Sequence, residues 1–305
     1  PVPHWPGRFV DLPSGRLHLH EALPTTDTAQ PAVLVHGLGG SATNWTDVMG
    51  LLRDRLHCLA PDLPGFGWSP PPRGRDYSLR AHALRVIELI ESLADLRGQP
   101  VHLLGNSLGG AVVTVVAAVR PELVRTLTLV SPALPVLRAR RTNIHLPALA
   151  LPFAGQRLAV RLGRHPAEAR VRATLQLCYA DPARVHPQRV AEAVAESRRR
   201  AALEHEPEAM LLSLRSLLSA YLRPGAWPLW ALTERVQAPT LLVYGLADKL
   251  VDPRTAARAA RSFPQARLVV IPDSGHVSQM EHPEVVAREV RALLDRASRA
   301  GARGG

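Results

Sequence analysis

The chain has 305 residues, 46% of them hydrophobic, and a formal charge of +11. These values suit one large globular domain with an insert, and the longest apolar run, residues 111–119 interrupted only by Thr114, is far shorter than the roughly 20 residues that cross a bilayer. Two cysteines, Cys58 and Cys178, are too few for a disulfide scaffold and have no metal-ligand spacing.

The basic charge comes from arginine, since Lys249 is the only lysine. The arginines are dispersed except in residues 138–141 and 198–200, and no nucleic-acid-binding motif accompanies them. We therefore attribute the charge to a compositional bias and expect no nucleic-acid partner. The first residues lack the pattern of a signal peptide, although the chain does not begin with Met. With only two cysteines, a cytoplasmic location is expected. The sequence predicts no oligomeric state.

Strand and helix signals alternate through the first 130 residues. A hairpin is expected where Arg8–Leu12 and Leu17–Ala22 flank a Pro-Ser-Gly turn. The later expected strands are Ala32–His36, His57–Pro61, Val101–Leu104 and Val124–Val130, and the expected helices are Trp45–Leu56, Leu79–Leu96 and Gly110–Arg120. This alternation predicts an α/β fold, a doubly wound and mostly parallel sheet with helices on both faces.

The alternation stops after the sixth strand. Between residues 133 and 235 only helical patterns occur, notably Ala167–Cys178, Pro187–Leu203 and Glu208–Leu222. It then resumes with a strand at Thr240–Tyr244, a helix at Arg254–Ser262, a strand at Arg267–Ile271 and a helix at Pro283–Ala300. We therefore expect a core of residues 1–132 and 236–305 and an inserted helical cap of residues 133–235.

The most informative motif is Gly105-Asn106-Ser107-Leu108-Gly109, between a predicted strand and a predicted helix. Gly-x-Ser-x-Gly at such a junction is typical of a nucleophile elbow, a turn so sharp that only small residues fit beside the serine. A serine hydroxyl is a weak nucleophile at neutral pH, so Ser107 needs a base and an acid that orients the base.

The loops after the last two strands supply these partners. In a parallel sheet the functional loops lie at the carboxyl ends of the strands. Asp248 follows one of these strands and His276 follows the next, which gives the chain order Ser, Asp, His. Asp252 is a rival acid, but its place before Pro253 favours an N-cap, and His282 is interpreted as a cap or surface residue.

Two backbone N–H groups should stabilise a developing oxyanion. One is expected from Leu108, which begins the helix after the serine, and the other from Leu38 in the glycine-rich loop His36–Gly40. The loop Asp62–Ser69 is interpreted as a structural turn that borders the site.

Taken in order, these motifs resemble the α/β-hydrolase superfamily, over about residues 8–298. The resemblance implies a serine hydrolase with a helical cap, similar to esterases and lipases, that needs no metal or organic cofactor. Ser107, Asp248 and His276 would form the triad, acting on a small-molecule ester through an acyl-enzyme. The expected substrates are carboxylic esters of small to medium size and mainly apolar character.

Two alternatives stay open. The Gly-Asn-Ser-x-Gly-Gly pattern is also similar to carbon–carbon bond hydrolases of ring-cleavage products, although Val277 stands where those enzymes usually carry Trp. A catalytically silent binding module is the non-enzymatic alternative. Within the insert, the apolar run Leu146–Phe153 is a candidate acyl pocket or a packing surface, and Trp227 and Trp230 are equally ambiguous.

Overall fold

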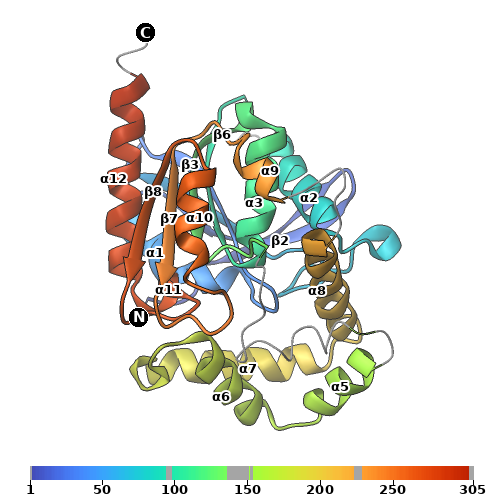
Figure 1. The fold of residues 1–305 in the computed structure, drawn as a ribbon. Helices are drawn as coiled ribbons and strands as arrows, with labels where there is room; N and C mark the ends of the chain where they lie inside the picture. The colour runs from blue at the N-terminus through green and yellow to red at the C-terminus, as the bar shows by residue number, and fades with distance from the viewer. Residues whose placement is uncertain (1, 94–97, 136–150, 152–153, 223–228, 302–305) are drawn as a thin grey trace.

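A computed structural model describes residues 2–93, 98–135, 151, 154–222 and 229–301. Eight strands form one sheet in the order β1-β2-β4-β3-β5-β6-β7-β8 (Figure 1). β1 pairs with β2, and β2 with β4, in antiparallel fashion, whereas the pairs from β4 through β8 are parallel. The predicted doubly wound, mostly parallel sheet is therefore confirmed.

The strands lie close to their predicted positions, because buried apolar runs mark the central ones and β-branched or alternating residues mark the outer strands. They are β1 (Gly7–Leu12), β2 (Gly15–Ala22), β3 (Gln30–Val35), β4 (Leu56–Pro61), β5 (Val101–Asn106), β6 (Val124–Val130), β7 (Thr240–Gly245) and β8 (Ala266–Ile271). Every residue of β5 and of β7 is buried, as expected for strands covered on both faces.

Helices cover both faces of the sheet. One core cluster joins the sheet to α2 (Leu79–Ser92), α3 (Leu108–Val119), α9 (Leu229–Thr233) and α10 (Thr255–Ser262). The other cluster joins the opposite face to α1 (Thr46–Leu52) and α12 (Pro283–Gly301). The short helix α11 (Ser278–Glu281) lies between β8 and α12.

Several predicted helix boundaries were wrong. The helix expected from Trp45 is a 3₁₀ turn, Ala42–Trp45, followed by α1, which ends at Leu52 because the chain turns there into β4. α2 ends at Ser92, since Leu93 is extended with φ −75° and ψ 127°. α9 and α11 were not predicted, because four or five residues are too few to show a helical period.

Every described element between β6 and β7 is helical. These elements are α5 (Ala154–Gly163), α6 (Ala167–Cys178), a 3₁₀ turn (Pro182–Arg184), α7 (Pro187–Ala201), α8 (Glu206–Leu222) and α9. Figure 1 shows α5, α6 and α7 below the sheet, whereas α9 lies beside α3. Within the described residues no helix is long and apolar enough to cross a membrane.

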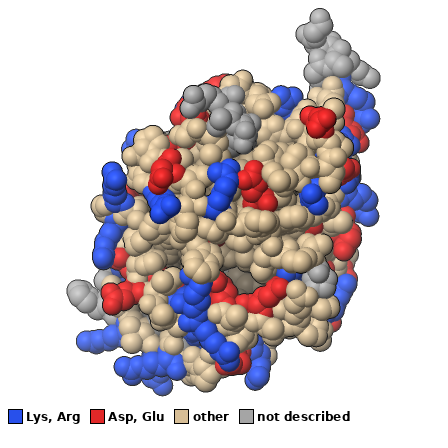
Figure 2. Space-filling view, turned by 180° about the vertical axis from the view of Figure 1, so that it is seen from behind, with Lys and Arg blue, Asp and Glu red and all other residues tan. Residues whose placement is uncertain are grey.

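The positive charge is concentrated in this segment. Residues 133–235 contain sixteen arginines and eight carboxylates, so they carry +8 of the formal charge of +11. Figure 2 shows basic side chains gathered along the lower edge of the molecule, where α5, α6 and α7 lie in Figure 1. The charge is therefore not spread evenly over the fold.

Candidate active site

Ser107 lies at the sharp turn between β5 and α3. Its backbone has φ 54° and ψ −117°, a positive φ that a residue with a side chain rarely adopts. Its N–H donates to the Val130 carbonyl at 3.1 Å, and its own carbonyl accepts from Ala133 N at 2.9 Å. Ser107 is half-buried, whereas its neighbours Asn106 and Leu108 are buried, so the turn presents the serine to the surrounding space.

The glycines of the motif are required by close contacts. A Cβ at Gly105 would strike the backbone of Gly109, and a Cβ at Gly109 would strike the carbonyl groups of Val35 and His36. The strand, the helix and the neighbouring strand β3 therefore approach one another more closely than side chains would allow.

The structure brings Asp248 and His276 into contact. His276 Nδ1 lies 2.9 Å from Asp248 Oδ2, and both side chains are buried. A carboxylate only accepts hydrogen bonds, so Nδ1 carries the hydrogen and Nε2 of the neutral ring is left as an acceptor. The other carboxylate oxygen, Oδ1, accepts from the backbone N–H groups of Leu250 (2.8 Å) and Val251 (2.9 Å).

These contacts keep Asp248 ionised. Burial alone would raise the pKa of its carboxyl group, but the charge interaction with His276 and the hydrogen bonds from His276, Val251 and Leu250 outweigh burial and lower the pKa below its usual value. A carboxylate that stays charged can hold the imidazole in one tautomer and stabilise it when it becomes positive.

The two rival residues lie elsewhere. Asp252 accepts from Arg254 N at 3.0 Å and pairs with the Arg254 guanidinium at 2.7 Å, two residues before the N-cap of α10, so the predicted N-cap position was wrong. His282 is the C-cap of α11, and its Nε2 lies 3.1 Å from the Asp273 carbonyl oxygen. It is buried rather than on the surface.

The glycine-rich loop after β3 forms a tight turn around Leu38. Gly40 N donates to the Gly37 carbonyl at 3.0 Å, and Gly39 has φ +71°, which is the pattern of a type II turn. His36 Nε2 accepts from Leu63 N at 2.9 Å, so its Nδ1 carries the hydrogen and donates to the Gly37 carbonyl at 2.8 Å.

The first N–H groups of a helix have no partner within it. Leu108 is the first residue of α3, so its N–H points out of the helix beside Ser107. Leu38 and Ser107 line the same cavity. A Cβ at Gly37 would lie 3.0 Å from Ser107 Cβ, so the loop that carries Leu38 meets the serine turn, and the oxyanion role of the Leu38 and Leu108 N–H groups stays a prediction.

The loop after β4 is held by Asp62. Its carboxylate accepts from Ala42 N (2.7 Å), Trp68 N (2.9 Å) and His18 Nδ1 (2.9 Å). Burial would raise the pKa of Asp62, but these hydrogen bonds outweigh burial and lower it. The network fixes the loop at the border of the cavity.

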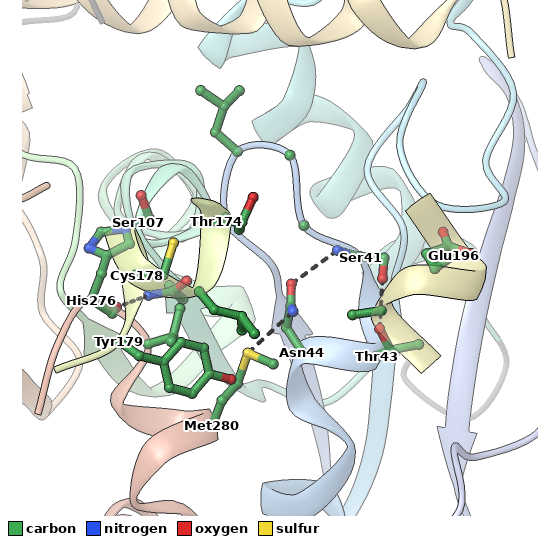
Figure 3. A pocket seen from close by; sticks show the side chains of 18 of the residues that line it. Ser41, Thr43, Asn44, Ser107, Thr174, Cys178, Tyr179, Glu196, His276 and Met280 are labelled. Atoms are coloured by element: carbon green, nitrogen blue, oxygen red, sulfur yellow. Dashed lines mark hydrogen bonds between the residues drawn. The ribbon is translucent and has the colours of Figure 1, made fainter. Parts of the chain in front are cut away.

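A large cavity lies between the sheet edge and the insert. Its volume is about 1870 Å³, and it is lined by Ser107 and His276 together with residues of α1, α6, α7 and α8. Figure 3 shows Ser107, Cys178 and His276 on one side of it, and Thr43 and Glu196 on the other. This volume exceeds the roughly 300–1000 Å³ of ordinary ligand pockets.

The cavity has an apolar wall and a charged wall. The apolar wall comes mainly from α8, with Met210, Leu214, Leu217, Leu218 and Tyr221. The charged wall comes mainly from α7, where Arg189 pairs with Asp47 and Glu192, Arg199 with Glu196, and Arg200 with Glu206. Arg200 also donates to the Gly39 carbonyl at 2.8 Å, which ties α7 to the Leu38 turn.

Some sequence-based expectations fall outside the described residues. The candidate acyl pocket Leu146–Phe153 is described only at Leu151, which is exposed, and Trp227 is not described. Trp230 donates to the Pro135 carbonyl at 3.1 Å and packs against the core. In the described part of the chain, no group of three His, Cys, Asp or Glu side chains is placed to hold a metal ion.

Sequence reasoning missed two charged residues beside the site. Lys249, next to Asp248, reaches α6, and Glu281, five residues after His276, hydrogen-bonds the loop that carries His276. The only available signal was the rarity of lysine in this chain.

A mostly parallel sheet with a strained serine turn at one strand end, and a His–Asp pair after two others, defines a hydrolase of the α/β class. The sequence profile of the alpha/beta hydrolase fold matches residues 31–283, and the chain belongs to this family. The predicted superfamily is therefore confirmed.

The relatives differ in their substrates. The "Putative carbamate hydrolase RutD" of Pseudomonas syringae pv. syringae is 32% identical, over 87% of this chain and 94% of its own. "Lipase 3" of Moraxella sp. is 26% identical, over 88% and 78%.

Two solved structures support the fold. The crystal structure of a membrane phospholipase A has a TM-score of 0.79 at 24% identity, covering 96% of this chain and 86% of that one. A thermophilic esterase from Thermogutta terrifontis has a TM-score of 0.72 at 24% identity, covering 95% and 99%. At these identities the likeness bears on the fold alone.

Proposed function

We propose that this protein is a serine hydrolase that cleaves carboxylic esters of small to medium, mainly apolar substrates through an acyl-enzyme. The observation that carries the proposal is the strained Ser107 turn at a cavity that is also lined by His276, the base of the buried Asp248–His276 pair. The turn exposes a nucleophile, and the pair supplies a base with a fixed tautomer.

The proposed reaction has two halves. Ser107 Oγ attacks the ester carbonyl while His276 Nε2 takes its proton, and the backbone N–H groups of Leu38 and Leu108 bind the oxyanion. The alcohol leaves with the proton from His276. Water, activated by the same ring, then attacks the acyl-enzyme and releases the acid.

The cavity supports the substrate class. Its α8 wall is apolar, which suits an acyl chain, whereas each of the three arginines of the α7 wall is paired with an acidic side chain, which disfavours an anionic substrate. We propose that residues 133–235 act as a cap on a core of residues 1–132 and 236–305.

Labelling tests the reaction type. A fluorophosphonate probe should modify the wild type, because it reacts only with an activated serine, and Ser107→Ala should abolish both labelling and hydrolysis of nitrophenyl acetate. Ser131→Ala, the variant of a buried serine after β6, is the control and should keep both. Absence of labelling in a folded wild type would favour the silent binding module.

Carbamate cleavage is the second candidate, favoured by the 32% identity to a protein named as a carbamate hydrolase. A panel of nitrophenyl esters, a nitrophenyl carbamate and a vinylogous diketone acid separates the three reactions. The ester proposal expects the largest kcat/KM for an ester. Asn106 gives no support to the carbon–carbon alternative, because its side chain donates to the carbonyl groups of Val130 and His276 and so has a structural use.

We also propose that the protein is cytoplasmic. Cys58 and Cys178 are unpaired, as is usual in a reducing compartment. Cell fractionation tests this, and recovery in an exported fraction would contradict it.

A further inference from the structure

The end of α6 is hydrogen-bonded to both loops that carry the proposed acid and base. Lys249 Nζ donates to the carbonyl groups of Gln176 (2.6 Å) and Tyr179 (3.1 Å). A cation at the C-terminus of a helix is favoured by the exposed carbonyl groups and by the helix dipole. Because Lys249 follows Asp248 directly, this contact fixes the loop of the acid against the insert.

The loop of the base meets the same segment. His276 N donates to the Cys178 carbonyl at 2.7 Å. A Cβ at Gly275 would strike the backbone from Cys178 to Ala180, so the His276 loop and the end of α6 are packed backbone to backbone. Figure 3 shows Cys178 and Tyr179 beside His276 on one side of the cavity.

Glu281 joins these two segments of the chain. Its Oε2 accepts from Gly275 N at 2.5 Å, and its Oε1 accepts from Ala180 N at 2.8 Å. Charge-assisted hydrogen bonds of this kind are about twice as strong as neutral ones. One carboxylate on α11 therefore binds the backbone of Gly275, just before His276, and that of Ala180, at the end of α6.

The charged and titratable groups around His276 are mixed in sign. They are Asp248, which lies at its Nδ1, Lys249, which follows Asp248 in the chain, Glu281, which accepts from the amide of Gly275, and Cys178. Burial raises the pKa of the Cys178 thiol to about 12. The charges of Asp248 and Glu281 add to this rise, and the charge of Lys249 opposes it. The thiol is therefore neutral and takes no part in the charge balance.

We propose that Lys249 and Glu281 are positioning residues that clamp the α6 end, residues 176–181, onto the loops of Asp248 and His276, so that docking of the insert sets the orientation of the His276 ring. This inference rests on the proposed function. It makes the insert a part of the catalytic geometry as well as a wall of the cavity. A helix that is separated from His276 by about a hundred residues of sequence would then control how the base faces Ser107.

Substitution of the two residues tests the clamp. Glu281→Gln keeps the shape of the side chain. Its amide oxygen can accept a hydrogen bond from only one of the two backbone N–H groups, because the amide nitrogen, a donor, faces the other. Displacement of a base by about 1 Å can cost about 10²-fold in rate. We therefore expect kcat for nitrophenyl acetate to fall by about 10- to 100-fold, with KM changed by less than about twofold because the substrate walls are intact.

Lys249→Met should likewise lower kcat and leave KM nearly unchanged. Lys249→Arg should keep kcat near the wild-type value, because a guanidinium can also donate to two carbonyl groups. Asp273→Asn is the matched control, since it removes the exposed ion pair between the His276 loop and Arg184, just after the clamped segment. It should leave kcat unchanged, as expected for an exposed pair.

Hydrogen exchange separates this inference from the proposed function. The amides of Gly275, His276 and Ala180 should exchange slowly in the wild type and faster in Glu281→Gln, with overall urea stability and exchange in β5 largely retained. If the wild type is inactive but the exchange result holds, the function is wrong and the clamp stands. Unchanged kcat, or unchanged exchange at these amides in a variant that folds, would overturn the clamp.

Discussion

Ser107 has a backbone conformation that costs about 1–3 kcal/mol for a residue with a side chain. Its neighbours hold it there, because its N–H and its carbonyl are both bonded to the chain that leaves β6. Asn106 adds bonds to the carbonyl groups of Val130 and His276, so the serine turn and the His276 loop are directly linked. The strain is therefore stored where the hydroxyl must be presented.

The choice of acid is tested at the residue scale. In Asp248→Asn the amide oxygen can still accept from Leu250 and Val251, but the amide nitrogen then faces His276 Nδ1. The ring would take the other tautomer, with its hydrogen on Nε2, and could not accept a proton from Ser107. We expect kcat to fall by about 10⁴-fold, the loss that follows from a wrong tautomer in a serine triad.

Asp252→Asn is the matched comparison, four residues along the chain. Its carboxylate pairs with Arg254 at the start of α10, so kcat should stay within about twofold of the wild-type value. Steady-state kinetics on the two purified variants provide the measurement. A large loss in Asp252→Asn together with normal activity in Asp248→Asn would show that the rival acid orients His276.

At the scale of the element, α8 supplies the apolar wall of the cavity. Leu218 on this helix is half-buried and lines the cavity, so a larger side chain there should fill space that an acyl chain would occupy. The wild type is expected to hydrolyse nitrophenyl octanoate with a higher kcat/KM than the acetate. Leu218→Trp should lower kcat/KM for the octanoate by about tenfold and leave the acetate nearly unchanged.

The control for this prediction is Leu212→Ala on the same helix, because Leu212 packs against the core. It should reduce stability without changing the order of the esters. A wild-type kcat/KM that declines steadily from acetate to octanoate would contradict an acyl pocket on α8.

The same scale shows what the sequence can and cannot predict. Strands such as β5 and β7 are buried apolar runs, and long helices such as α12 have a clear amphipathic period, so both were predictable. Gly105 and Gly109 predicted a sharp turn with close backbone packing around Ser107, and the structure confirms this packing. Helices of one turn, such as α11, have no period to detect.

The residues that hold the loops of the candidate site in place could not be predicted from the sequence. Ser107, Asp248 and His276 follow strands, so the rule on strand ends was enough to propose them. The contacts of Lys249 and Glu281 reach α6, about 70 and 100 residues away along the chain. No local pattern encodes such a contact, because it depends on how the insert is folded back onto the core.

At the scale of the whole molecule, two buried histidines join separate parts of the fold. His102 on β5 bonds to Thr126 of β6 and Gln30 of β3, both at 2.7 Å. His82 on α2 bonds to Ser213 of α8 at 3.0 Å, which ties the insert to the core. Burial lowers the pKa of each ring to about 3, with smaller contributions from nearby basic groups.

Acid should therefore destabilise the fold well before the carboxylates titrate. In the unfolded chain each ring has an ordinary pKa near 6.5, so the unfolded state binds more protons between about pH 6.5 and pH 3. Stability is then fully present above pH 6.5 and falls as the pH is lowered towards 3. From pH 7 to pH 5 each histidine should cost about 2 kcal/mol of unfolding free energy.

Urea unfolding at pH 7 and pH 5 measures this loss. His102→Gln should be less stable than the wild type at pH 7, because its two hydrogen bonds are disturbed, but it should lose about 2 kcal/mol less on going to pH 5. His165→Gln is the control, since His165 is exposed in both the folded and unfolded chain and its loss should leave the pH dependence unchanged. Equal losses in His102→Gln and the wild type would mean that His102 is protonated inside the sheet, and the acid sensitivity of the molecule would then have to originate outside β5.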